Sequence, residues 1–177
     1  MIDEKRVKEA QKNFAVYLGE YLIKKEKNET AKAMYLKNAD LSLRFAEEAM
    51  NSRLRPFLWV IVVSYYSMFY MANAVLLELG YKTGEKAVHK VTHDALIVLV
   101  MNKIKKGLIE EYENAKQDAF QIASIKSEEI ISLYSLELDK RSKFQYNMTK
   151  TIEEKHANTS LKRAKIFMLE MKKLFPI

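Results

Sequence analysis

The strongest constraint on this chain is a run of 22 uncharged residues, PFLWVIVVSYYSMFYMANAVLL, at positions 56–77. Such a run is long enough to cross a lipid bilayer as a helix, but it also fits the buried central helix of a bundle. Six of its residues carry polar groups, which are unfavourable in a lone membrane span: Ser64, Tyr65, Tyr66, Ser67, Tyr70 and Asn73. We therefore expect a buried central helix at 56–80, with a membrane span as the alternative.

The rest of the chain is typical of a few long helices. Only 4 Gly and 2 Pro occur in 177 residues, whereas a β-rich fold needs frequent turns made with such residues. Apolar residues recur every three or four positions in two segments: 4–25, where the last of them is Tyr21, and 30–51. This spacing is typical of a helix with one buried face. A last stripe contains Ala157, Leu161, Ala164, Met168 and Met171. With a shorter helix at 87–105, the sequence predicts an all-α bundle of five to six helices.

Several residues are candidates for helix ends. Asn28 or Thr30 can cap the second helix, and Gly80 suits the position just after the central one. No Gly or Pro lies between Gly107 and Pro176, so breaks in that segment must come from capping residues. We expect them at Ser127, which two acids follow, and at 147–151, where Thr151 and Glu154 have capping-box spacing.

Charge and cysteine content narrow the functional classes. The chain has no cysteine, which excludes disulfides and thiolate metal sites and fits a cytoplasmic protein. Its first residues, MIDEKRVKEAQKNF, lack the apolar segment of a signal peptide. The net charge of +7 suits a polyanionic partner such as RNA. The alternative is an ordinary basic protein whose lysines form a solvated face.

Two histidines, His89 and His93, have the four-residue spacing of a helical metal site, and Asp94 follows them directly. No third ligand is placed by the sequence, so packing of His89 at a helix start is the favoured interpretation. We expect no metal and no other cofactor.

The string YYSMFYMANAVLLELGY, at 65–81, resembles the signature helix of the HEPN superfamily, and is closest to its small stand-alone archaeal and bacterial members. Three other segments fit this resemblance: LKNADLSLRFAEEAM at 36–50, the pair His89-Lys90, and RSKFQY at 141–146. The resemblance implies an up-and-down HEPN-like bundle over 29–177, with 1–28 as a helical extension of the single domain 1–177. It also implies a homodimer, a nucleotidyltransferase partner protein, and a role in a toxin–antitoxin or defence module.

Active relatives in that superfamily cleave RNA without a metal ion, through an arginine followed four to six residues later by a histidine. The arginine position falls on Arg141, but Tyr146 stands where the histidine is expected. Because tyrosine has a pKa near 10, it is a poor base at neutral pH, although it can donate a hydrogen bond or stack on a nucleobase. We expect a helix end near Asn147 to bring Arg141 and Tyr146 together as a catalytic pair of a metal-independent endoribonuclease.

The surrounding segment, KRSKFQYNMTK at 140–150, has four basic residues and no acid. Lys140, Lys143 and Lys150 are the candidate RNA-binding residues, since basic side chains interleaved with aromatic ones suit single-stranded RNA. The sequence therefore predicts an RNA-acting protein. The alternative is a non-catalytic dimer that binds a nucleotide or a partner protein.

Overall fold

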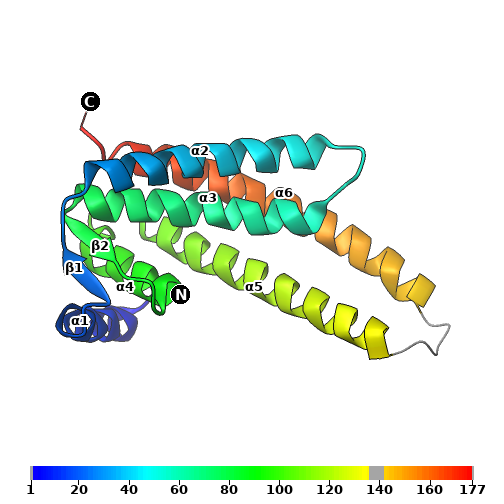
Figure 1. Ribbon diagram of the computed structural model, residues 1–177, viewed down its shortest axis with the longest axis horizontal. Helices are drawn as coiled ribbons and strands as arrows, with labels where there is room; N and C mark the ends of the chain where they lie inside the picture. Colours follow the sequence, from blue (N-terminus) through cyan, green and yellow to red (C-terminus); the bar gives the residue numbers. More distant parts are fainter. Residues whose placement is uncertain (1, 136–141, 177) are drawn as a thin grey trace.

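Helix α3 (Phe57–Glu78) is the centre of the structure. The computed structural model describes residues 2–135 and 142–176, and the side chains of 2–122 and 154–176. The other described elements are α1 (Glu4–Gly19), β1 (Ile23–Lys25), α2 (Glu29–Asn51), β2 (Tyr81–Thr83), α4 (Val88–Leu99), α5 (Lys106–Ser135) and α6 (Ser142–Lys172). Figure 1 shows α2, α3 and α6 packed along one another, α5 beneath them, and α1 at one end beside α4. The predicted all-α bundle is confirmed, with six helices in the described residues.

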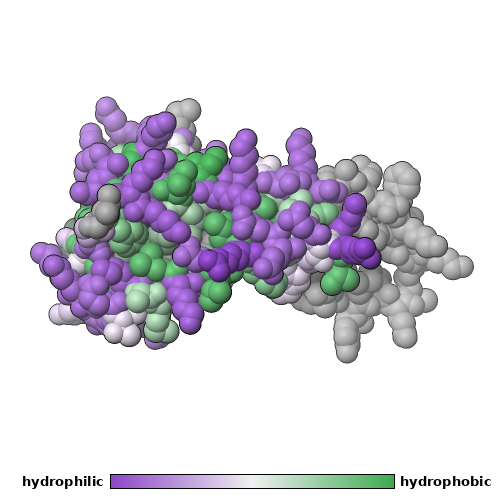
Figure 2. Space-filling view, turned by 90° about the horizontal axis from the view of Figure 1, so that it is seen from above, coloured by the Kyte–Doolittle hydropathy of each residue, from purple (hydrophilic) through white to green (hydrophobic). Residues whose placement is uncertain are grey.

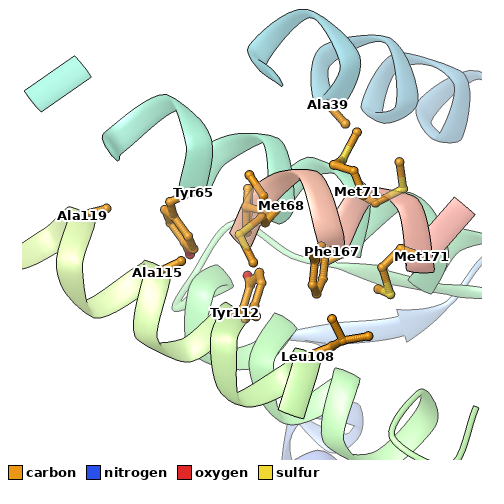
Figure 3. Packing of buried hydrophobic residues seen from close by; sticks show 14 of the residues in the cluster. Ala39, Tyr65, Met68, Met71, Leu108, Tyr112, Ala115, Ala119, Phe167 and Met171 are labelled. Carbon is orange, nitrogen blue, oxygen red and sulfur yellow. The ribbon is translucent and has the colours of Figure 1, made fainter. Parts of the chain in front are cut away.

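The main core lies where α3 meets α2, α5 and α6. Aromatic rings from three helices pack against one another. The ring centroids of Tyr65 and Tyr112 are 5.8 Å apart with the rings tilted, and those of Tyr112 and Phe167 are 5.5 Å apart with the rings stacked. Figure 3 shows these rings together with Met68 between the helices. All five residues of the predicted C-terminal stripe are buried, which confirms the face of α6 that contacts the core.

Helix α3 is long and apolar enough to cross a membrane by length and composition, and 78% of its most apolar window is buried inside the molecule. Among the described residues it is the only helix that meets this criterion. Burial against four other helices is how the central helix of a bundle behaves, as expected from its six polar-capable residues.

The N-terminal helix was predicted too long. It ends at Gly19, and the chain then turns through Tyr21, whose φ is +57° and whose side chain is 79% exposed. Residues Ile23–Lys25 pair antiparallel with Tyr81–Thr83, a two-stranded sheet that we did not expect. The buried, β-branched Ile23 suits a strand better than a helix. Similarly, α4 ends at Leu99 rather than near residue 105.

Helix ends that depend on local capping were predicted with mixed success. Asn28, not Thr30, caps α2, because its side chain accepts a hydrogen bond of 2.8 Å from the Ala31 amide. Gly80 has a φ of +83° just after α3, as expected of a glycine that ends a helix. The breaks expected at Ser127 and 147–151 are wrong, since α5 and α6 run through them. Capping residues inside a helix lower its stability only slightly when no Gly or Pro interrupts it.

Candidate functional site

Of the residues predicted to act on RNA, Lys143, Tyr146 and Lys150 belong to the first turns of α6 (Ser142–Lys172). Lys140 and Arg141 lie outside the described residues, and the side chains of Lys143, Tyr146 and Lys150 do too. The expected helix end near Asn147 is wrong, because α6 begins at Ser142 and continues to Lys172. In a continuous helix, positions 143, 146 and 150 are spaced by three and four residues and so share one face.

Most basic residues of the described part of α6 serve the fold itself. Arg163 pairs with Asp118 at 2.6 Å and also with Glu111 on α5. Lys165 and Lys172 pair with Glu47 and Asp40 of α2, at 2.8 and 2.9 Å. These pairs connect α6 to its neighbours, whereas Lys155 and Lys162 have no ion pair among the described residues.

The most prominent buried polar cluster is elsewhere, where α1, α4 and α5 meet. Its centre is Asp94, which is fully buried on α4 directly after the buried polar residues Thr92 and His93. Asp94 accepts hydrogen bonds from the Arg6 guanidinium, from Asn13 at 3.0 Å and from the Tyr17 hydroxyl at 2.9 Å. Burial, and then the hydrogen bond to Asp94, raise the pKa of Tyr17, so it remains a neutral donor. A buried carboxylate with three donors is well compensated.

His93 lies beside this ion pair and contacts a second carboxylate. Its Nδ1 lies 3.1 Å from an oxygen of Glu113 and 3.4 Å from the Arg6 guanidinium. The carboxylate can only accept and the guanidinium can only donate, so Nδ1 has a partner in either tautomer of the ring. Burial lowers the pKa of His93, with Glu113 opposing and Lys116 adding to the effect, so the ring is neutral at pH 7.

A groove of about 510 Å³ opens next to this cluster. Its lining comes from the N-terminal Ile2 and from α1, α4 and α5: Arg6, Lys90, His93, Glu110, Glu113, Asn114, Lys116 and Gln117. Glu110 accepts from the Ile2 amide at 2.7 Å, and Glu113 accepts from Lys116 at 2.7 Å and from Gln117 at 3.1 Å. The groove is therefore polar, with its acidic groups engaged by neighbouring donors.

His89, one helical turn before His93, has a different environment. Its Nδ1 lies 2.7 Å from the Tyr65 hydroxyl, and its ring packs 4.5 Å from Phe69 and 5.2 Å from Phe120 between centroids. Burial lowers the pKa of His89, and Lys116 lowers it further. Packing at the start of α4 is thus confirmed for His89. In the residues described, no group of three or more His, Cys, Asp or Glu side chains could hold a metal ion.

His93 and Asp94 were candidate site residues from the sequence, but the residues that contact them were not. A charged residue in the apolar segment VTHDALIVL signals a buried partner by itself. The partner Arg6 is 88 positions away, on a segment that we expected to be an extension. In sequence, Glu110, Glu111 and Glu113 resemble an ordinary solvated face. In the structure, Glu110 and Glu113 accept hydrogen bonds and Glu111 forms an ion pair with Arg163.

Comparisons with known proteins found no match to a family model, to a curated protein or to a solved structure. The resemblance to the HEPN superfamily therefore rests on the sequence motifs and stays a prediction.

Proposed function

We propose that this protein is an RNA-binding helical bundle of HEPN-like type, which contacts RNA through the basic segment 140–150. The observation that carries the proposal is the composition of that segment: four basic residues, Phe144 and Tyr146, and no acid. Phosphate neutralisation combined with base stacking is the usual basis of single-stranded RNA binding. The ion pairs of Arg163, Lys165 and Lys172 support this choice, because they engage three basic residues of the other half of α6 within the molecule.

Binding is favoured over cleavage by the residue at position 146. Cleavage without a metal needs a group that takes a proton from the ribose hydroxyl near neutral pH, and histidine suits this role. Tyr146 does not, so Arg141 would hold a phosphate and Tyr146 would stack or donate without completing a catalytic pair. By its resemblance, the protein would work in the cytoplasm beside a nucleotidyltransferase, as one half of a toxin–antitoxin or defence pair.

The binding of a labelled single-stranded RNA at several salt concentrations tests this proposal. Replacing Lys140, Lys143 and Lys150 together by Gln should weaken binding and lower the salt slope by about 2, since each phosphate contact on a single strand contributes about 0.7. The matched control replaces Lys165, Lys172 and Lys173 by Gln, which removes the same charge from ion-paired positions in the last turns of α6 and directly after it. Equal losses in the two variants would contradict a local RNA site.

The same RNA, incubated with EDTA, separates binding from cleavage. We expect it to stay intact with the wild type and to bind less tightly to Arg141→Ala. Cutting by the wild type that Arg141→Ala abolishes would instead establish a metal-independent nuclease with a tyrosine in its site.

We also propose that the protein forms a homodimer through the outer face of α2. Met34, Leu41 and Phe45 are 61%, 51% and 53% exposed there, and Lys37 and Glu48 share that face. Figure 2, which views the molecule from above and so over α2, shows hydrophobic groups between the hydrophilic ones. In a two-fold pair of antiparallel α2 helices, Lys37 of one copy lies near Glu48 of the other, so the face is self-complementary.

Light scattering tests the dimer directly. The wild type should have the mass of two chains, and Phe45→Lys should have the mass of one while keeping its helical circular dichroism. A monomeric wild type at high micromolar concentration would contradict this interface.

A further inference from the structure

Five aromatic rings that reach the surface form a continuous band from α2 to α5. They are Tyr35 of α2, Tyr66 and Tyr70 of α3, His89 of α4 and Phe120 of α5, and none of them is buried. Neighbouring ring centroids are 6.2 Å apart for Tyr35 and Tyr70, 5.9 Å for Tyr70 and Tyr66, 6.1 Å for Tyr66 and His89, and 5.2 Å for His89 and Phe120. We call these five residues the aromatic band. A contiguous exposed patch of this kind marks an interaction site, whereas scattered exposed rings are ordinary.

Buried rings support the aromatic band. The Tyr65 hydroxyl lies 2.7 Å from His89 Nδ1, and both Tyr65 and Phe69 are buried. The Phe69 ring centroid is 4.5 Å from that of His89 and 6.1 Å from that of Tyr66. Because these contacts fix the exposed rings before a ligand arrives, binding there loses little side-chain entropy.

The exposed aromatic surface continues along α3 toward α6. Trp59 is 58% exposed and lies two helical turns before Tyr66, so the two rings share one face of α3. Just before α3 begins, Arg55 forms an ion pair of 3.8 Å with Glu154 of α6. Glu154 follows the segment 140–150 by four residues in a continuous helix. Trp59 therefore lies at the end of α3 that is next to the basic segment.

The chemistry of this surface suits unpaired nucleobases. Every base has a flat face that stacks on an aromatic ring, and polar edges that a tyrosine hydroxyl or an imidazole can bond. The band itself has no cation for the phosphates, which the basic segment 140–150 offers. Arg53, which is exposed and has no ion pair among the described residues, adds a cation between the two.

We infer that the aromatic band and Trp59 stack the unpaired bases of a single-stranded RNA whose phosphates contact the segment 140–150. This inference rests on the proposed RNA binding and adds that the bound bases must be unpaired.

The fluorescence of the wild type tests the inference, because Trp59 is the single tryptophan of the chain. A short oligouridylate should quench it by base stacking. A duplex RNA of the same length, whose bases are paired, and inorganic polyphosphate, which has no bases, should not. Quenching to the same extent by all three ligands would overturn the inference.

The anisotropy of the same oligouridylate carrying a fluorescent label, measured in parallel, separates this inference from the proposed function. If the labelled RNA binds and the Trp59 fluorescence does not change, the inference is wrong and the RNA-binding proposal stands. If the labelled RNA does not bind at all, both are wrong.

Three variants locate the stacking surface. Tyr66→Leu removes a ring of the band but keeps an apolar side chain, so oligouridylate should bind about tenfold more weakly, as expected for one lost base stack. The salt slope should not change, since no charge is removed. Tyr66→Phe keeps the ring and should bind nearly as tightly as the wild type. Tyr21→Leu, the matched control, removes an exposed tyrosine outside the band and should have no effect.

Equal affinities of Tyr66→Leu and Tyr66→Phe would overturn the inference and leave the band as a surface for a partner protein. A lower salt slope in Tyr66→Leu would also overturn it, because that change reports lost phosphate contacts. Since Tyr66 packs against Phe69, Trp59→Leu is the second variant. Its side chain is mostly exposed, so the replacement spares the core and should weaken oligouridylate binding to a similar degree.

Discussion

The core around α3 and the interface between α1 and α4 are held together by different forces. The first is a large apolar cluster in which Met68 and Phe167 are buried between three helices. The second has a small apolar cluster, including Phe14 and Ile23, and beside it the ion pair of the partly buried Arg6 with the fully buried Asp94. Apolar burial has no direction, whereas a buried charge is compensated only in one geometry. The comparison suggests that the core supplies stability and that the α1–α4 interface defines one local arrangement.

The largest expected effect is on the core. Phe167→Ala should lower the free energy of unfolding by about 3–5 kcal/mol, because it removes a fully buried ring that stacks on Tyr112. Phe120→Ala is the matched control, since this ring is 48% exposed, and it should change the unfolding free energy much less. Urea denaturation measures both. Similar losses in the two variants would show that burial in this core is not what stabilises the fold.

The charged interface should respond strongly to loss of one partner and weakly to loss of both. Arg6→Gln leaves Asp94 charged and buried, which should lower the free energy of unfolding by about 3 kcal/mol. This is the lower end of the range for a broken buried pair, because the Arg6 side chain is 25% exposed. Adding Asp94→Asn removes the uncompensated charge and should restore part of the loss. If the effects of Arg6→Gln and Asp94→Asn on the free energy of unfolding simply add, Arg6 and Asp94 are not coupled, and the proposed difference between the core and the α1–α4 interface is contradicted.

The fold class could be predicted from sequence because apolar periodicity is a local property, as the five buried residues of α6 show. The interface could not, since Arg6 and Asp94 come from elements 88 positions apart. The short sheet was missed for the same reason: Ile23 pairs with Thr83, and no local pattern connects them. Of the two candidate sites, the RNA segment came from sequence alone, whereas the groove required three helices to meet.

The smallest expected effect is a dependence of stability on pH. Burial lowers the pKa of His93 below its ordinary value of 6.5, so the unfolded chain binds a proton first as the pH falls. The stability from neutral His93 is thus complete above pH 6.5 and is lost as the pH falls toward the folded-state pKa. The free energy of unfolding, measured by denaturation at pH 7.5 and below pH 6, should show this loss. The loss should be smaller in His93→Asn. If the stability of His93→Asn depends on pH as strongly as that of the wild type, the effect belongs to His89, because burial lowers the pKa of His89 as well.

The central claim is that RNA contacts the segment 140–150 rather than the α3 core or the α1–α4 interface. Ultraviolet crosslinking of a bound single-stranded RNA, followed by mass spectrometry of the attached peptides, tests it most directly. The account predicts crosslinks at Phe144 and Tyr146. Crosslinks confined to α2, or to the groove beside His93, would contradict it.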